Sequence, residues 1–204
     1  MAIIQNALIY LFGFSGTGKL SIARELQTLV PCTIVDNHLI NNVVLSLIDA
    51  DGKSPLLPLV WEHIARIRAV VFDTIRTLSG SQRNFIFTNE LIEGVEVARR
   101  VFAQVAEVAS SRNAKFLPVR LLITPEELAR RVASPGRAAL HKGTDAAAAF
   151  RKAREQVVLI ETHDIGTLLR AAGRGESCIR PAGCGLPVGD HKDRPYIVCQ
   201  SFVV

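Results

Sequence analysis

Apolar residues along the chain gather in short continuous runs that are separated by segments with helical spacing. The run Ala7–Phe12 is uninterrupted, which is typical of a strand buried on both faces of a parallel sheet. Further strands are predicted at residues 33–36, 84–88 and 116–123. We therefore expect four strands before residue 124.

Between these runs, apolar positions recur every three or four residues, which predicts amphipathic helices. The clearest helical patterns lie at residues 22–29, 60–78 and 97–108. Strands that alternate with helices predict a parallel sheet with right-handed crossovers. The expected fold class is therefore α/β, with three layers, α/β/α, around a parallel sheet.

Another helix is expected to begin at Thr124. Threonine can cap a helix, Pro125 suits the first helical position, and Glu127 can close a capping box. Residues 134–136, Ser-Pro-Gly, break this helix, and a basic stretch at 137–142 follows. Residues 146–161 are predicted to be helical again.

The last 32 residues differ from the rest of the chain. From residue 173 the sequence is rich in Gly, Pro, Cys and Arg and has no periodicity, until a final strand is predicted at 196–204. We expect one domain over residues 1–172, with a lid around 134–145, and an irregular tail over 173–204.

Composition and charge limit the classes of partner. The chain has 204 residues, 49% hydrophobic and 21% charged, which is a globular rather than a disordered composition. The net charge of +5 favours polyanions, but the basic residues are dispersed, so a nucleic-acid partner is not indicated. No apolar run is long enough for a membrane span, and no secretory signal is evident. We expect a cytoplasmic protein with no membrane partner and with its four cysteines reduced.

The strongest motif directly follows the first strand. Residues 13–19, Gly-Phe-Ser-Gly-Thr-Gly-Lys, match the phosphate-loop pattern G-x-x-x-x-G-K between a strand and a helix. The glycines allow backbone N–H groups to turn toward phosphate oxygens, and Lys19 would supply a mobile positive charge. The predicted nucleotide-binding residues are Gly13, Ser15, Gly16, Thr17, Gly18, Lys19, Leu20 and Ser21.

The residue after Lys19 departs from the usual pattern. Ser or Thr normally stands there and binds Mg²⁺, whereas this chain has Leu20, with Ser21 one place later. Ser21 lies about a hundred degrees further around the helix and cannot simply substitute. Thr17 or Ser15 could approach the ion, or water could complete its shell. No metal site made of protein ligands is predicted.

Two features favour a kinase over a switch protein. Asp36 ends the second predicted strand, where ligands bind in open α/β sheets, and could orient an acceptor hydroxyl or take its proton. Capping of the next helix is the equally weighted alternative. Arg131 and Arg137 belong to a basic cluster that could neutralise a migrating phosphoryl group, or form a solvated face. Glu90, after the third strand, could take a polar role or cap the following helix.

The order of these segments resembles the P-loop small-molecule kinases, a group that includes adenylate kinase, shikimate kinase and chloramphenicol phosphotransferase. The loop at residues 13–20, with Leu20, resembles an uncharacterised bacterial branch labelled AAA-family ATPase. The resemblance spans roughly residues 7–161. It implies a P-loop NTPase fold of the nucleotide-kinase type, ATP on residues 13–19, Asp36 facing the acceptor, and Arg131 and Arg137 in the lid.

These observations predict an ATP-dependent phosphotransferase with Mg²⁺ as cofactor and a small hydroxylated or phosphorylated acceptor. Lys19, Asp36, Arg131 and Arg137 are the expected catalytic residues. A nucleotide-binding regulatory or interaction protein with slow or no hydrolysis is the alternative, and Leu20 favours it. A nucleic-acid-binding ATPase rests on the positive charge alone.

Overall fold

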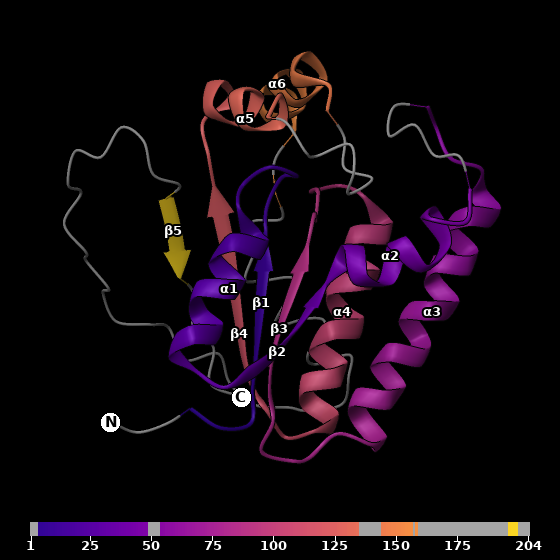
Figure 1. Ribbon diagram of the computed structural model, residues 1–204, viewed down its shortest axis with the longest axis vertical. Helices are drawn as coiled ribbons and strands as arrows, with labels where there is room; N and C mark the ends of the chain where they lie inside the picture. The colour runs from indigo at the N-terminus through magenta and orange to yellow at the C-terminus, as the bar shows by residue number, and fades with distance from the viewer. Residues whose placement is uncertain (1–3, 49–53, 135–143, 157, 159–195, 200–204) are drawn as a thin grey trace.

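The computed structural model describes residues 4–48, 54–134, 144–156, 158 and 196–199. Four strands form a parallel sheet: β1 (Ala7–Phe12), β2 (Cys32–Asp36), β3 (Asn84–Asn89) and β4 (Lys115–Leu122). The spatial order is β2-β3-β1-β4-β5 (Figure 1). The predicted α/β class and the four predicted strands are confirmed.

The last strand lies at the edge of the sheet, beside β4. β5 (Tyr196–Cys199) lies within the strand predicted at 196–204, of which residues 200–204 fall outside the described part of the chain, and it pairs antiparallel with β4 at the edge of the sheet. The sequence predicted no direction for this last strand, so the parallel sheet predicted from the first four strands gains an antiparallel edge strand. An antiparallel edge strand is common on otherwise parallel sheets.

Helices follow the strands, as the apolar spacing predicts. Each predicted helix is present, with ends that differ by a few residues where capping and not periodicity sets the boundary. Within the described residues the helices are α1 (Lys19–Leu29), α2 (Asn37–Leu45), α3 (Pro58–Thr77), α4 (Glu96–Ser111), α5 (Pro125–Val132) and α6 (Ala146–Glu155).

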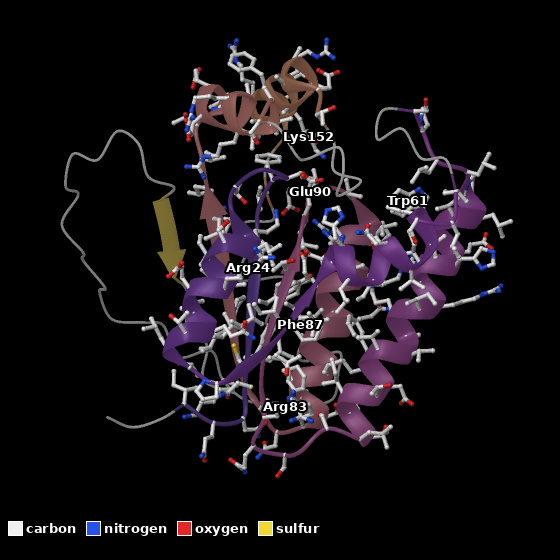
Figure 2. All side chains as sticks on the ribbon, in the orientation of Figure 1. Arg24, Trp61, Arg83, Phe87, Glu90 and Lys152 are labelled. Carbon is white, nitrogen blue, oxygen red and sulfur yellow. The ribbon has the colours of Figure 1, made fainter. Side chains whose placement is uncertain are left out.

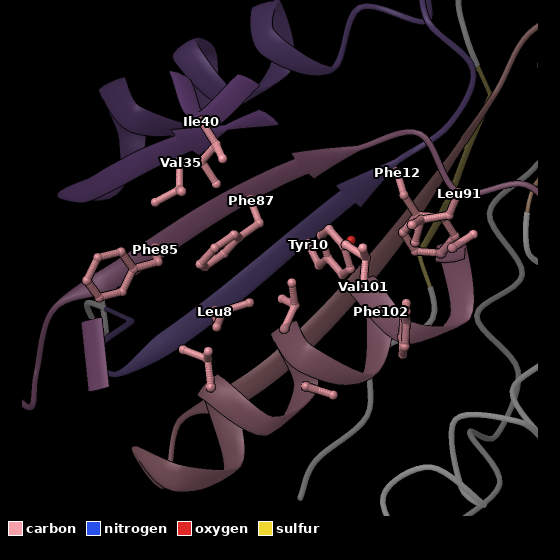
Figure 3. Close-up of a cluster of buried hydrophobic side chains, with 14 of the residues drawn as sticks. Leu8, Tyr10, Phe12, Val35, Ile40, Phe85, Phe87, Leu91, Val101 and Phe102 are labelled. Carbon is pink, nitrogen blue, oxygen red and sulfur yellow. The ribbon is translucent and has the colours of Figure 1, made fainter. Parts of the chain in front are cut away.

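Apolar residues cover both faces of the sheet. On one face, aromatic side chains pack against each other beneath α3 and α4. The ring centroids of Tyr10 and Phe102 lie 5.6 Å apart (Figure 3), and those of Phe72 and Phe87 are also 5.6 Å apart. On the other face, Ala23 of α1 packs against the side chains of β1 and β3. Helices on both faces are compatible with three α/β/α layers. Because these helices cover the strands on both sides, the strands are continuous apolar runs.

The capping box predicted at the start of α5 is confirmed for Thr124 but not for Glu127. The Thr124 hydroxyl accepts a hydrogen bond from the Glu127 N–H at 3.3 Å, as a cap should. The reciprocal contact predicted for Glu127 is wrong, because its carboxylate binds Arg130 and Arg131 instead. Charge-assisted bonds to two guanidinium groups are stronger than a bond to one neutral N–H.

Several predictions lie outside the described residues. Most of the lid predicted around 134–145, including Arg137, falls in the undescribed segment 135–143. The tail is described only at β5, so the domain boundary at residue 172 stays a prediction. Among the described residues, no helix is both long and apolar enough to span a membrane.

Candidate functional site

The candidate site lies at the carboxyl ends of β1, β2 and β3. Parallel pairing sets Phe12 beside Asn89 and Asp36 beside Thr88, so the segments that leave these strands start at the same edge of the sheet. The Gly13 N–H donates to the Asn89 carbonyl at 3.2 Å, and this hydrogen bond joins the segment that follows β1 to the end of β3. Ligands of open α/β sheets bind beyond the carboxyl ends of the strands, where these segments begin.

Residues 13–18, here called the glycine loop, connect β1 to α1. Gly16 has φ of 107° and Gly18 has φ of 89°, both in the left-handed region that favours glycine. Thr17 donates its N–H to the Phe14 carbonyl at 3.2 Å and closes a tight turn. Gly18 is the N-cap of α1, so the positive end of that helix begins at the loop.

The first glycine is required by close packing. A Cβ atom at Gly13 would lie 2.7 Å from the Leu121 carbonyl oxygen of β4 and 3.1 Å from the Thr17 hydroxyl oxygen. Contacts below 3.0 Å to backbone atoms force the chain to shift. The motif therefore has glycine where β1 leaves the sheet because β4 leaves no room for a side chain.

Lys19 folds back across the glycine loop. Its Nζ donates to the carbonyl oxygens of Gly13 and Phe14, at 2.8 Å each. The side chain thus places a positive charge against a turn that leads directly into the N-terminal end of α1. A polyphosphate anion is the ligand class that this combination of charge and helix end suits.

The hydroxyl groups near the loop do not form a Mg²⁺ ligand set. Thr17 is fully buried, and its hydroxyl donates to the Phe14 carbonyl at 3.0 Å, while Ser21 is exposed on α1. Leu20 has no ligating atom. Among the described residues, no group of three or more His, Cys, Asp or Glu could hold a metal. Within the part of the chain that the structure describes, the side chains around the loop therefore do not form a Mg²⁺ site of their own.

Asp36 stands at the end of β2 and is tied to β3. It occupies the N-cap position of α2 without making a side-chain cap. Its Oδ1 accepts a hydrogen bond from the Thr88 hydroxyl, and that hydroxyl accepts one from the Asn37 N–H at 3.2 Å. Of the two roles considered for Asp36, the capping bond is not formed, and Thr88 instead fixes the carboxylate.

Glu90 follows β3 and reaches the glycine loop. Its Oε1 accepts a hydrogen bond from the Ser15 N–H at 2.9 Å, and its Oε2 pairs with Lys152 Nζ of α6 at 3.0 Å. Figure 2 shows Lys152 lying over Glu90 at the top of the sheet. The capping role considered for Glu90 is wrong, since Val95 is the N-cap of α4.

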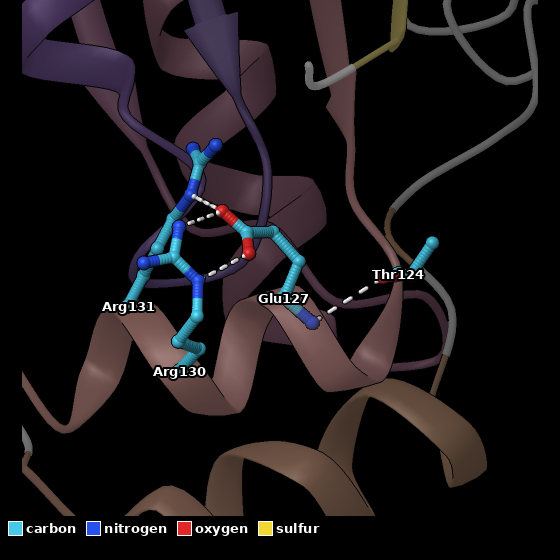
Figure 4. A network of polar contacts seen from close by, with 4 residues as sticks. All are labelled: Thr124, Glu127, Arg130 and Arg131. Carbon is cyan, nitrogen blue, oxygen red and sulfur yellow. Dashed lines mark hydrogen bonds and ion pairs between the residues drawn. The ribbon is translucent and has the colours of Figure 1, made fainter. Parts of the chain in front are cut away.

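Arg131 approaches the glycine loop from α5. A Cβ atom at Gly18 would lie 3.6 Å from Arg131 Nη1, so the guanidinium borders the start of α1. Glu127 holds Arg131 Nε at 2.6 Å and Arg130 Nε at 2.6 Å (Figure 4). Hydrogen bonds from Arg130 and then Arg131 lower the pKa of Glu127 from 4.5 to about 2. One predicted arginine therefore lies at the loop, held in place by a carboxylate.

The sequence did not reveal two further polar residues. Lys152 lies on α6, and its neighbours in the sequence do not single it out. Its position at the site depends on the packing of α6 on α5. Arg68 lies on the core-facing side of α3, between Ile64 and Phe72, and burial lowers its pKa. Its Nε is buried, and no described residue forms a hydrogen bond with it. A charged residue four positions from buried apolar residues on both sides was a signal that could have identified Arg68.

Two comparisons with known proteins bear on the chain as a whole. No protein-family model matches the sequence, and no curated protein is similar enough to count as a relative.

Proposed function

We propose that this protein is a P-loop NTPase of the nucleotide-kinase type that transfers the γ-phosphate of ATP to a small hydroxylated or phosphorylated acceptor. The observation that carries the proposal is the position of Lys19, whose ammonium group lies within 2.8 Å of two carbonyls of a loop with two left-handed glycines. This arrangement at a helix N-terminus suits a triphosphate.

The glycine loop accounts for phosphate binding. The start of α1 adds a positive partial charge, and Lys19 can move from the loop carbonyls to a β- or γ-phosphate oxygen. Arg131, which borders Gly18, adds a second positive charge close to the loop. Fixed positive groups stabilise the charge that develops on the transferring phosphoryl group.

Asp36 accounts for the acceptor side of the reaction. Among the described residues, its carboxylate is bonded only through Oδ1, to Thr88, so Oδ2 remains for an acceptor hydroxyl. In the proposed step the acceptor oxygen bonds to the γ-phosphorus, the bond from that phosphorus to the β–γ bridging oxygen breaks, and ADP leaves. The hydroxyl proton passes to Asp36 late in the step.

Mg²⁺ would accompany ATP as a counter-ion held by phosphate oxygens and water. This expectation follows from the lack of protein ligands around Leu20 and Thr17 among the described residues. Mg²⁺ retains several waters in many nucleotide sites, so a protein hydroxyl is not a strict requirement.

Transfer of label from γ-labelled ATP tests the proposal. The protein is incubated with Mg²⁺, labelled ATP and a bacterial metabolite extract, and the products are separated. We expect a labelled small molecule that is lost with Lys19→Ala, and lost with Asp36→Asn although ATP still binds. Label that stays in ATP, or appears only as free phosphate, contradicts the transferase proposal for the acceptors present.

A nucleotide-binding regulatory protein is the second candidate, and one observation favours it. The position that usually holds the metal-binding hydroxyl is Leu20, and the Thr17 hydroxyl is committed to the Phe14 carbonyl. A loop that binds a nucleotide but positions Mg²⁺ poorly would turn over slowly. ATP binding that depends on Lys19, without transfer to any acceptor, is the result that this candidate predicts.

A further inference from the structure

A carboxylate already occupies one donor of the glycine loop. Glu90 Oε1 accepts the Ser15 N–H at 2.9 Å, and Ser15 is the third residue of the seven-residue motif. Backbone N–H groups of such loops are the groups that bind phosphate oxygens. The loop therefore directs one N–H toward an internal anion.

The same carboxylate holds a lysine. Glu90 Oε2 lies 3.0 Å from Lys152 Nζ, and both side chains are partly exposed, at 29% and 37%. A single carboxylate, that of Glu90, therefore contacts both Lys152 and the Ser15 N–H. A carboxylate flanked by a backbone N–H and an ammonium group has the same kind of partners as a bound phosphate oxygen.

The helix that carries Lys152 is anchored beside Glu90. α6 packs on α5, and Asp145 caps α6 by accepting the Ala148 N–H at 2.9 Å. Just beyond α6, Val158 forms a β-bridge with Ile92, two residues after Glu90. Packing on α5 and the bridge beyond its last turn therefore hold α6 beside Glu90, and the long side chain of Lys152 can change partners without movement of the helix.

We propose that Glu90 is an internal substitute for phosphate, and that an incoming nucleotide displaces it and takes over both the Ser15 N–H and Lys152. This inference rests on the proposed function, because it assumes that phosphate binds in the glycine loop. It assigns Lys152 as a phosphate-binding residue and Glu90 as an autoinhibitory one. A negative charge held at the loop opposes a second anion until the carboxylate turns away.

The proposal predicts an unusual sign for one substitution. A carboxylate that assists nucleotide binding through a metal would weaken binding when neutralised. A carboxylate that competes with phosphate would strengthen binding when neutralised, because the competing anion is lost. Glu90→Gln retains the size of the side chain and an amide oxygen that can still accept the Ser15 N–H.

Calorimetric titration with ADP in EDTA tests the proposal without metal or acceptor. We expect Glu90→Gln to bind ADP about fivefold more tightly and Lys152→Met about fivefold more weakly than the wild type. In the double variant, Lys152→Met should still weaken binding relative to Glu90→Gln alone, since Lys152 contacts phosphate directly. Glu107→Gln and Lys115→Met, at exposed positions on α4 and β4, are the controls.

Three outcomes overturn the proposal and leave the proposed function standing. One is equal or weaker ADP binding by Glu90→Gln. The second is unchanged or tighter binding by Lys152→Met alone, a variant that does not depend on how Glu90→Gln folds. The third is no effect of Lys152→Met in the Glu90→Gln background, which would mean that Lys152 only neutralises Glu90. Absence of Lys19-dependent ADP binding by the wild type would reject both the inference and the proposed function.

Discussion

The hydroxyl of Thr88 donates a hydrogen bond to the carboxylate of Asp36, and this bond joins the ends of two neighbouring strands. The same hydroxyl accepts the Asn37 N–H at 3.2 Å, so a single oxygen atom fixes both the carboxylate and the first turn of α2. The orientation of the proposed acceptor-binding residue therefore depends on β3 as well as on β2.

Thr88→Val should impair transfer more than nucleotide binding. The substitution keeps the shape of the side chain but removes the donor to Asp36 and the acceptor for Asn37. We expect the rate of transfer to fall about tenfold and the free energy of unfolding to fall by about 1–2 kcal/mol. Initial-rate kinetics and urea denaturation measure the two effects. Thr88→Ser, which retains the hydroxyl, should transfer at close to the wild-type rate. Equal rates for Thr88→Val and the wild type would contradict the role of Thr88 in orienting Asp36.

Gly18→Ala should reduce both stability and nucleotide affinity. Gly18 has φ of 89°, where a side chain costs about 1–2 kcal/mol, and a Cβ there would lie 3.6 Å from Arg131 Nη1. Thermal denaturation and ADP titration are the measurements. Gly94→Ala is the matched control, because Gly94 has φ of 75° with nothing within 4 Å and lies outside the glycine loop. Gly94→Ala should lose stability and keep its affinity for ADP. If Gly94→Ala and Gly18→Ala lose the same affinity, the weaker binding results from reduced stability and not from the glycine loop.

The strands and helices were predictable because burial follows local sequence pattern. The run Ala7–Phe12 becomes a central strand with five of its six residues buried, and the glycine loop begins at the next residue. Thr124 caps α5 because capping depends on residues three positions apart. The direction of β5 was not predictable, since the choice of a strand's partner is not written in its own residues.

The candidate site was predictable only where it is local in sequence. The glycine loop and Lys19 form one motif that can be recognised within seven consecutive residues. The contact between Glu90 and Lys152 joins residues 62 positions apart and required the packing of α6. Asp36 was placed correctly at a strand end, but its tie to Thr88, 52 residues away, appears only when β2 and β3 pair.

Arg68→Met should stabilise the protein. Arg68 lies on the buried side of α3, and its buried Nε has no hydrogen-bond partner among the residues that the structure describes. Removal of a desolvated charge in favour of an apolar side chain of similar length should raise the free energy of unfolding by about 1 kcal/mol. Urea denaturation measures the change. Arg66→Met, at an exposed position on the same helix, is the control, and a loss of stability in Arg68→Met would contradict the account.

Glu127 should make stability depend on acid pH. Its pKa in the folded protein is about 2, below the ordinary value of 4.5, through hydrogen bonds from Arg130 and Arg131. A folded-state pKa below the unfolded value stabilises the protein above about pH 4.5, and the effect is lost as the pH falls toward 2. The side chain is only 21% exposed, but Arg130 is 74% exposed, so we expect about 0.5 kcal/mol after solvent screening.

Urea denaturation of Glu127→Gln and the wild type across this range checks the sign. The difference in free energy of unfolding should be present at pH 7 and should shrink steadily below pH 4.5. Glu126→Gln, the exposed neighbour on α5, should show no comparable trend. A difference between Glu127→Gln and the wild type that is constant with pH would contradict the assignment.

Direct measurement of ATP binding tests the central claim. Isothermal calorimetry with ATP and Mg²⁺ should show one site per chain in the wild type and in Lys115→Ala, a control at an exposed lysine of β4. Lys19→Ala should bind at least about tenfold more weakly, because the ammonium group over the glycine loop is lost. Binding that is absent in the wild type, or unchanged in Lys19→Ala, would contradict the assignment of residues 13–19 as a nucleotide site.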